Sequence, residues 1–474
     1  MKKFILFGGI IVALGVCWAG CSWYTGTQVG PVVTRLINEY NSSNTRSLKI
    51  VCKNFSGGVF TSHLQLVIFL NKKNNDPENS VVMDVNIAHG PFPFLSLKKG
   101  HFSPQRASIQ AKFIEDISYN TSSENNRFFD LNIQSVIGYD KKMTTDINIF
   151  PGTLNLTTGS LSIGGGNITY LADLEGSDND TLEGKIDKVI LDLGNGSLFY
   201  LKDISLKATD HYYSEIVDSG HVDIEFNGIA KKDNGKEVLS ADQIAASISL
   251  NQSKDKINSD LKLRYMVKNL KNEGRNIGSG EFSVNIGKLN VEILKKAVDK
   301  YNSDLDLLVA KESRIKGDPQ GINKIISNII STYVPLLQIS EPTINVPVHW
   351  KNDKGDILAN LDVSIADPQK TVTNDESITA NIDRNLHNIS LSMTVPINAA
   401  AQLDSQFKQA KGENKNNAEK YAHNDMVNII MLANTYDLIN VNDDIVTMQF
   451  QYSKGKVILN NKEISVADLL SKNH

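Results

Sequence analysis

The sequence predicts an α+β protein that is mainly β: a large antiparallel β-rich body with a few packed amphipathic helices, preceded by one N-terminal transmembrane helix. Three observations predict this architecture. The chain opens with Lys2 and Lys3 and then an apolar run from Phe4 to Tyr24, which reaches the ~20 residues that a membrane-spanning helix needs. Much of the remaining chain alternates apolar and polar residues between short turns, as half-buried strands do. A few segments instead carry apolar residues three and four positions apart, as amphipathic helices do.

Residues 1–26 are interpreted as an uncleaved signal anchor. The apolar core of a cleaved signal peptide is typically only ~7–15 residues long and ends at a small-residue cleavage site, whereas this run is longer and no such site follows it. Both lysines precede the run, so the positive-inside tendency places the N-terminus in the cytoplasm and the bulk of the chain across the membrane. The residues expected in the membrane and at its far interface are Phe4, Trp18, Trp23 and Tyr24.

Two alternatives to an uncleaved anchor stay open: plain cleavage, and a lipoprotein signal ending at Cys21. Trp18-Ala19-Gly20-Cys21 approximates the small-small-Cys pattern of lipoprotein signals, although Trp stands where an aliphatic residue is usual. Small residues also recur every fourth position, a spacing that lets two helices approach closely, or that simply reflects a helix rich in small residues. The possible helix-dimer stripe comprises Gly9, Ala13, Cys17 and Cys21.

Composition is that of a globular body without a nucleic-acid function. The chain has 474 residues, of which 41% are hydrophobic, so it can bury a real core. A formal net charge of -4 lacks the basic excess of nucleic-acid binders. Cys52 is the only cysteine outside the first 26 residues, so an internal disulfide of the body is excluded and Cys52 is expected to be free and buried.

The segment from Gly30 to Tyr40 has apolar residues at helical spacing, with Pro31 near the start where proline is tolerated. It predicts a short amphipathic helix that leaves the membrane. We interpret this helix as a lid on the first sheet, with a surface-lying or dimerising stalk as the alternative.

Residues 27–230 are predicted to form an N-terminal β-rich region and residues 231–474 a C-terminal one. The boundary is placed at a polar turn, Asp233-Asn234-Gly235. Because the alternating segments are joined by short polar turns, antiparallel hairpins and meanders are expected rather than strand–helix–strand units. The alternating segments include 64–70, 85–87, 147–149, 204–208, 222–226, 261–267, 282–286 and 344–350.

Two helical elements are predicted in the C-terminal region. The first is a helical hairpin over 288–338, in which Asp318 and Pro319 form the N-cap and first position of the second helix. The second is a helix over 418–438. The polar runs 369–376 and 408–420 are expected to be exposed loops.

No motif for catalysis, cofactor binding or metal binding is found. No two of the nine histidines have the i, i+4 spacing of a helical zinc site, and phosphate-loop, dinucleotide and nucleophile-elbow patterns do not occur. The Gly278-Ser279-Gly280 stretch leads into a strand and is expected to relieve crowding there. We therefore predict a non-enzyme with no cofactor and no metal.

Two segments have unusual local composition. His89-Gly90-Pro91 ends a strand in a turn restricted by proline, where the histidine either hydrogen-bonds the turn or binds a ligand or senses pH. Glu341 and Pro342 precede a proline-limited strand that ends in Trp350, and this tryptophan is expected in the core.

These segments give the chain a family resemblance. Together with Trp23-Tyr24-Thr25-Gly26, Gly278 to Glu281, Ala366-Asp367-Pro368 and Gly455-Lys456-Val457, they resemble the YdgA/YihF family of enterobacterial envelope proteins, most closely its YihF branch. The resemblance spans nearly the whole chain. It implies a protein of unknown function that is associated with the inner membrane and faces the periplasm, and it brings no catalytic residues.

Two functions are consistent with these observations. The first is a non-enzymatic envelope scaffold or interaction module on the periplasmic side of the bacterial inner membrane, anchored by a single pass and self-associating as a homo-oligomer. The alternative is binding or transfer of lipid or another envelope amphiphile on an apolar face of the sheet, if that face is partly uncovered. Neither function involves nucleic acid.

Overall fold

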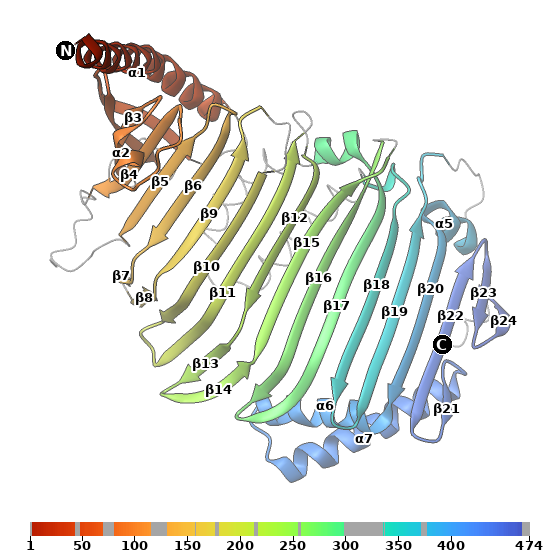
Figure 1. Cartoon of the computed structure of the whole chain (residues 1–474). Coiled ribbons are helices and arrows are strands. Elements are labelled where there is room, and N and C mark those ends of the chain that lie inside the picture. Colours follow the sequence, from red (N-terminus) through yellow and green to blue (C-terminus); the bar gives the residue numbers. More distant parts are fainter. Residues whose placement is uncertain are drawn as a thin grey trace. The chain divides into compact units, whose positions relative to one another are not determined.

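The computed structural model describes residues 2–42, 48–69, 80–114, 130–156, 158–175, 180–212, 217–254, 257–297, 335, 337–370 and 377–466. Of residues 2–14, 114, 156 and 211–218 it describes the backbone alone. The protein is mainly β, as predicted, and neighbouring strands pair antiparallel along both halves of the chain (Figure 1).

Two compact units make up the fold. Unit 1 comprises residues 1–195 and 203–215, and unit 2 comprises residues 196–202 and 216–474. Strand β11 (Ser197–Tyr212) contributes residues to both units. The turn at which the sequence places its boundary follows strand β13 (Ile229–Asp233), inside unit 2.

Unit 1 is built on an antiparallel meander. Its strands lie in the order β1-β2-β3-β4-β5-β6-β9-β10, and the β7–β8 hairpin pairs with the far end of β10 (Figure 1). The strands are β1 (Lys49–Gly57), β2 (Thr61–Phe69), β3 (Ser80–His89), β4 (Ala107–Ile114), β5 (Leu131–Ile137), β6 (Lys142–Ile149), β7 (Gly152–Leu156), β8 (Gly159–Ile163), β9 (Gly166–Asp173) and β10 (Asp180–Asp192).

Helix α1 (Lys2–Ser42) covers the first strands of unit 1. The buried core there is formed by side chains such as Leu64 and Val85, and Val29 and Val33 of α1 pack against it. The lid predicted from the sequence is thus confirmed. The predicted membrane helix and the predicted lid helix are one continuous helix of 41 residues, with Pro31 inside it. A short helix, α2 (Phe94–Leu97), lies between β3 and β4.

Unit 2 contains a second antiparallel sheet. Its main order is β12-β15-β16-β17-β18-β19-β20-β22-β23-β24, with β21 on β22; residues 197–201 of β11, then β13 and β14, lead to the end of β16. The strands are β12 (Val217–Phe226), β14 (Lys236–Ala241), β15 (Gln243–Gln252), β16 (Asn258–Asn272), β17 (Arg275–Asn290), β18 (Thr343–Asn352), β19 (Gly355–Ile365), β20 (Leu386–Pro396), β21 (Asn440–Asn442), β22 (Ile445–Ser453), β23 (Lys456–Leu459) and β24 (Lys462–Ser465).

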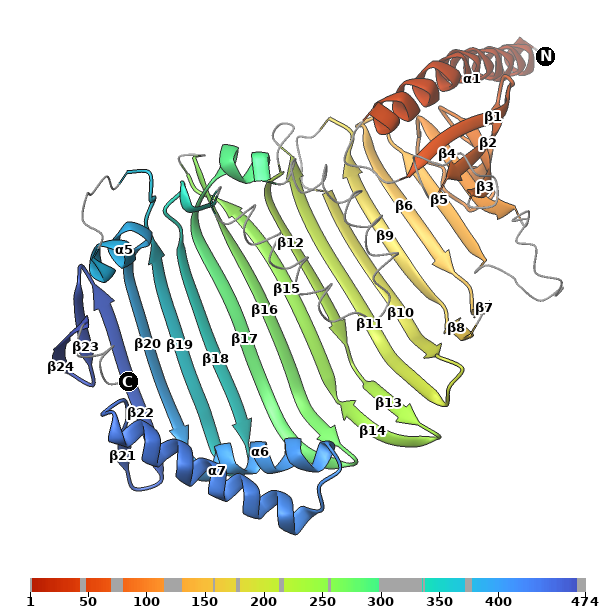
Figure 2. The same ribbon diagram turned by 180° about the vertical axis from the view of Figure 1, so that it is seen from behind.

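Unit 2 also contains helices α5 (Ile378–Asn385), α6 (Ile397–Ala410) and α7 (Lys415–Thr435). Helices α6 and α7 pair with each other, and α6 contacts β18, β19 and β20 near their ends (Figure 2). The helix predicted over 418–438 is α7, which begins three residues earlier. The helical hairpin predicted over 288–338 begins too early, because residues 288–290 still belong to strand β17. Residues 291–297 are helical, as the hairpin requires, and most of the rest of it lies outside the described residues.

The loop predicted over 408–420 is wrong. It contains the end of α6 and the start of α7, where the Asn414 side chain caps the helix by accepting a hydrogen bond from the Asn417 N–H. Helix α6 buries the small residues Ala399 and Ser405 against its neighbours. Its packed face therefore lacks the stripe of large apolar side chains by which an amphipathic helix is predicted from sequence.

Candidate functional site

The sheet of unit 2 has one continuous apolar face. Residues that pair across antiparallel strands point to the same side, so the strand registers show which side chains share a face. One row of paired residues crosses eight strands, and the Tyr265 hydroxyl is the one side-chain group in it that forms hydrogen bonds readily. The row comprises Ile224, Ala246, Tyr265, Phe282, Val348, Ala359, Met393 and Met448. The neighbouring row carries Val222, Ile248, Leu263 and Val284 on the first four of these strands. We call this surface the apolar face.

The centre of the apolar face is open in the described part of the chain. Ile248 is 46% exposed, Tyr265 47% and Phe282 39%, although each has apolar neighbours on its own sheet. The rings of Tyr265 and Phe282 stack with 6.1 Å between their centroids. These exposures contrast with unit 1, where α1 buries the equivalent surface over its first strands.

At the C-terminal end of unit 2 the apolar face is covered. Ile382 of α5 packs against a buried cluster around Tyr452 and Val457. The Tyr452 hydroxyl donates to Asp383 Oδ1 at 2.8 Å. Burial, reinforced by the hydrogen bond to the Asp383 carboxylate and its charge, raises the pKa of Tyr452 to about 12. Among the described residues, α5 therefore covers one end of the apolar face and no element covers its middle strands.

The opposite face of the same sheet is polar. Arg264 donates two hydrogen bonds to the Glu281 carboxylate, at 2.6 and 2.9 Å, and the bond to Arg264 holds the pKa of Glu281 below its usual range. Asn345 is hydrogen-bonded to Asn285 at 2.8 Å and to Asp362 at 2.7 Å. The two faces thus differ sharply in polarity, and the polar one is suited to water.

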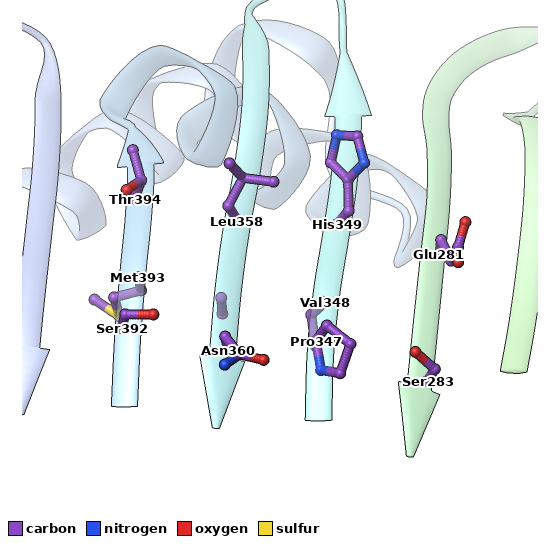
Figure 3. Close-up of a pocket in the computed structure, with 11 residues that line it drawn as sticks. Glu281, Ser283, Pro347, Val348, His349, Leu358, Asn360, Ser392, Met393 and Thr394 are labelled. Atoms are coloured by element: carbon purple, nitrogen blue, oxygen red, sulfur yellow. The ribbon is translucent and has the colours of Figure 1, made fainter. Parts of the chain in front are cut away.

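A hollow of about 540 Å³ lies on the polar face, across β17 to β20 (Figure 3). Pro347 and Leu358 line it beside Glu281 and His349. Its ionisable groups already have partners, because Glu281 is held by Arg264 and His349 Nε2 lies 3.4 Å from Asp356 Oδ1. In the described part of the chain no three His, Cys, Asp or Glu side chains gather as metal ligands, here or elsewhere. The hollow is suited to a weak polar contact and supplies no prepared acid, base or metal site.

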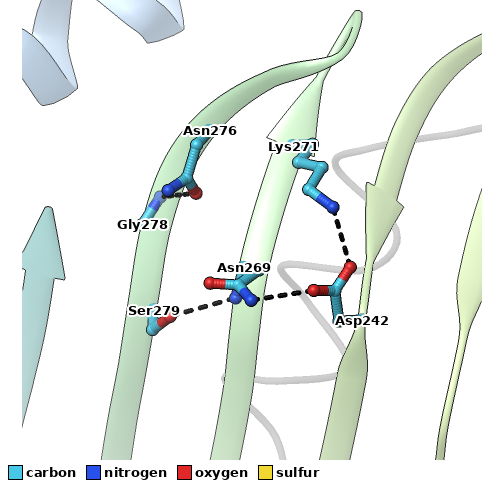
Figure 4. Close-up of polar contacts among 6 residues, drawn as sticks. All are labelled: Asp242, Asn269, Lys271, Asn276, Gly278 and Ser279. Carbon is cyan, nitrogen blue, oxygen red and sulfur yellow. Dashed lines mark hydrogen bonds and ion pairs between the residues drawn. The ribbon is translucent and has the colours of Figure 1, made fainter. Parts of the chain in front are cut away.

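A polar network holds a bulge in β16 next to β17. The backbone N–H of Asn269, which has a φ of 49°, donates to Ser279 Oγ at 3.0 Å, and its side chain donates to Asp242 at 2.8 Å (Figure 4). Lys271 also donates to Asp242, and these two hydrogen bonds, from Lys271 first and Asn269 second, lower the pKa of the Asp242 carboxyl. The Ser279 hydroxyl thus accepts a hydrogen bond from the Asn269 N–H, which the bulge removes from the backbone pairing between strands. The network therefore stabilises the bulge and has a structural role.

Gly278, Gly280 and Trp350, singled out separately from the sequence, meet in the structure. A Cβ on Gly280 would lie 2.3 Å from Cε3 of the Trp350 ring, and one on Gly278 2.9 Å from its Nε1. The glycines therefore relieve crowding, as predicted, and the group they make room for is the indole, which the sequence did not indicate. Trp350 is half-buried rather than a core residue as predicted, and its buried Nε1 has no hydrogen-bond partner among the described residues.

The His89-Gly90-Pro91 segment is hydrogen-bonded to neighbouring segments of unit 1. His89 is 1% exposed; its Nδ1 lies 2.9 Å from the Val59 carbonyl and its Nε2 2.9 Å from Ser62 Oγ. Ser22 of α1 donates to the Gly90 carbonyl at 2.7 Å. This histidine therefore hydrogen-bonds the turn and its neighbours, and no surface remains on it for a ligand.

Glu341 and Pro342 are held by ion pairs and a hydrogen bond to neighbouring segments of unit 2. Burial alone would raise the pKa of the Glu341 carboxyl, but the hydrogen bond and charge of Lys370 outweigh it and lower the pKa. Lys370 Nζ and His387 Nε2 lie 3.4 and 3.7 Å from this carboxylate. The Pro342 carbonyl accepts a hydrogen bond from the N–H of Ile365.

The predicted anchor residues divide between packed and exposed positions on α1. Trp18 packs against the rings of Phe60 and Phe94, whereas Trp23 and Tyr24 are 59% and 65% exposed. Cys17 and Cys21 of the possible dimer stripe are exposed, while the side chains of Phe4, Gly9 and Ala13 lie outside the described ones. Among the described residues, no helix is both long enough and apolar enough to span a membrane.

Cys52 forms no disulfide with another described residue of the chain, and it is half-buried rather than buried as predicted. Burial raises the pKa of its thiol. It packs against the core of unit 1, so its role there is that of a small apolar side chain.

Ile248, Tyr265 and Phe282 were not predicted to share a surface. Tyr265 and Phe282 belong to predicted alternating segments, whereas the strand that carries Ile248 was not predicted. The alternation did not reveal the register between strands, on which the continuity of the face depends.

Comparison with known proteins gives relatives but no function. Two proteins of Escherichia coli K12 are similar over nearly the full length: the uncharacterised protein YihF is 26% identical, covering 98% of this chain and 97% of its own, and protein YdgA is 25% identical, covering 99% and 96%. An uncharacterised protein of Haemophilus influenzae is 30% identical over 118 residues, covering 23% of this chain and 31% of its own. No solved structure matches.

A family model described as bacterial protein of unknown function (DUF945) matches residues 1–467, and the resemblance inferred from the short motifs is thereby confirmed. The chain belongs to the DUF945 family.

Proposed function

We propose that this protein is a membrane-tethered component of the bacterial envelope that binds an amphiphile with acyl chains on the apolar face of unit 2. The observation that carries the proposal is the apolar face, whose main row crosses eight strands and which is open, among the described residues, at Ile248, Tyr265 and Phe282. Apolar surface in water is unfavourable by roughly 25 cal/mol per Å², so covering this face with acyl chains is favourable.

The chemistry of the face favours acyl chains over a polar ligand. Within the row no side chain offers a hydrogen bond except the Tyr265 hydroxyl, so a sugar or peptide would lose hydration without replacement bonds. An acyl chain loses nothing polar. Contiguous exposed apolar patches of this kind are typical of interaction sites on soluble domains.

The sequence supports the tether. The apolar run from Phe4 to Tyr24, behind two lysines, has the length and charge pattern of a single-pass anchor with a cytoplasmic N-terminus. In this proposal the body lies on the periplasmic side of the inner membrane, close to a source of phospholipid.

Photo-crosslinking in cells tests the proposal. The full chain carries p-benzoylphenylalanine either at Tyr265 on the apolar face or at Leu358 on the polar face, two positions with 47% and 45% exposure. Irradiated protein is purified, its bound lipid is extracted, and covalent adducts are identified by mass spectrometry. We expect lipid adducts at position 265 and not at 358. Adducts at neither position, or equal amounts at both, would refute amphiphile binding on this face.

A second candidate is the scaffold function through self-association, which one observation favours. The C-terminal half of α7 exposes Ile429, Met431 and Leu432 at 56%, 61% and 61%, an apolar cluster suited to a protein partner. We expect the full chain in detergent to be oligomeric by light scattering corrected for the detergent, and Ile429→Ser with Leu432→Ser to shift it to monomer. A wild-type chain that is already monomeric removes this candidate.

A further inference from the structure

The segment between β3 and β4 in unit 1, residues 90–106, exposes aromatic side chains that take no part in the apolar face of unit 2. Phe102 is 72% exposed, Phe94 41% and Phe92 36%. Single exposed apolar residues need no explanation, but three exposed phenylalanines within eleven residues are a high local concentration of apolar surface, which we call the aromatic patch.

This segment is an ordered platform rather than a loose loop. Pro93 and Ser96 are buried, the Gln105 N–H donates to the Pro91 carbonyl at 2.9 Å, and Ser96 Oγ donates to the Gln105 side chain. Since the backbone is already held in place, presenting the phenylalanines to a partner requires little further ordering.

The platform is fastened to the part of α1 expected to leave the membrane. Trp18, within the apolar run, packs on Phe94 with 5.1 Å between ring centroids, and Ser22 donates to the Gly90 carbonyl. On α1 itself Trp23 and Tyr24 remain exposed. Phe94 and Gly90 therefore lie beside the part of α1 that carries the aromatic residues expected at the membrane interface.

Charge on the platform is complementary to anionic headgroups. Between Phe94 and Phe102 lie Lys98, Lys99 and His101, all exposed, and residues 90–106 contain no Asp or Glu. Aromatic side chains with adjacent lysines and no carboxylate are the composition of surfaces that lie in the headgroup region.

We propose that residues 90–106 dock onto the bilayer surface from which α1 emerges, with the phenylalanines in the headgroup–acyl boundary and Lys98 and Lys99 on anionic phospholipid. The inference rests on the membrane tether of the proposed function. It makes unit 1 a body seated on the membrane instead of one held away from it.

Depth-dependent quenching tests the docking. The full chain, with its three cysteines replaced by serine, is reconstituted into vesicles containing phosphatidylcholine and phosphatidylglycerol, some of whose acyl chains carry bromine. A polarity-sensitive fluorophore is attached through Phe102→Cys or, as the matched control, through Phe150→Cys. Phe150 is 45% exposed and directly follows β6. The Arg106 N–H, at the end of the platform, donates to the Ile137 carbonyl at one end of β5, whereas the Phe150 N–H donates to the Asp130 carbonyl at the other end. Phe150 therefore lies at the end of these strands opposite to the platform.

We expect brominated lipid to quench the label at 102 and to leave the label at 150 unchanged. Lys98→Gln with Lys99→Gln should reduce the quenching in vesicles that contain phosphatidylglycerol. A chain that floats with the vesicles but shows no greater quenching at 102 than at 150 overturns the docking alone, and is the result expected if the patch serves a protein partner. A chain that does not float with the vesicles overturns the tether and the docking together.

Discussion

Replacement of Gly26 by alanine tests how α1 is fixed to unit 1. A Cβ at this position would lie 2.6 Å from both Cε1 and Nδ1 of His89 and 3.0 Å from the Gly58 carbonyl oxygen. The imidazole cannot retreat freely, because its two nitrogens bond the Val59 carbonyl and Ser62 Oγ. The substitution therefore separates α1 from the sheet or breaks these bonds.

The magnitude follows from three contributions. Overpacking of a close-packed core costs about 1–3 kcal/mol. Leaving the buried partners of His89 without hydrogen bonds costs about 1–3 kcal/mol more. Alanine is favoured over glycine in a helix by about 1 kcal/mol, so the net loss for Gly26→Ala is about 1–5 kcal/mol.

Hydrogen exchange measured by mass spectrometry on the full chain in detergent reports this loss locally. Peptides covering β2 and β3 should exchange at least about fivefold faster in Gly26→Ala, since 1.4 kcal/mol corresponds to a factor of ten in local opening. Gly20→Ala is the matched control on the same helix, because nothing lies within 4 Å of its Cβ. Equal exchange in both variants and the wild type would show that the contact between Gly26 and His89 does not hold α1 in place.

Three further predictions concern other parts of the molecule. The pKa of Tyr452 is raised from about 10 in the unfolded chain to about 12, so its contribution to stability is complete below pH 10 and is lost as the pH rises toward 12; Tyr452→Phe should flatten that dependence in unfolding titrations of unit 2. Gly280→Ala should displace Trp350, lower the stability of unit 2 by about 1–3 kcal/mol and red-shift the tryptophan emission, whereas an unchanged spectrum would place the indole elsewhere. If two anchors meet along the small-residue stripe, mild oxidation in membranes should crosslink the exposed Cys21, and a dimer that persists in Cys21→Ser but disappears in Cys52→Ser would contradict this arrangement.

Much of the fold was predictable because strand periodicity is a local property. The alternation at 261–267 and 282–286 predicted strands β16 and β17, and short polar turns predicted that neighbours in sequence pair antiparallel. Helix α6 was not predicted, because it packs through Ala399 and Ser405, whose small size gives no apolar stripe. Local pattern thus found many of the strands with large apolar side chains and missed α6, which packs closely through small ones.

The candidate site was less predictable, since it depends on relations between distant segments. Tyr265 and Phe282 each appeared as apolar strand residues, but which face they share and whether a helix covers it are set by register and tertiary packing. The same limit applied to His89, for which the sequence favoured a hydrogen bond within the turn and left a ligand or a pH sensor as the alternative. Only the bonds to Val59 and Ser62, with Gly26 closing the remaining side, decide in favour of the turn.

The antiparallel pairing of near neighbours in the chain has a consequence for how the protein folds. From β1 to β6, and again from β15 to β20, each strand pairs with the one just before it. Contacts that are local in sequence close short loops and form quickly, so a chain emerging from its N-terminus can add strands one at a time to an existing edge. α1 is already made when β1 to β5 arrive, and it can shield their apolar side before the second unit exists. When strands are added in this order, the growing edge of the sheet is always one strand that waits for the next in sequence. Incorrect strand pairings therefore have less time to form.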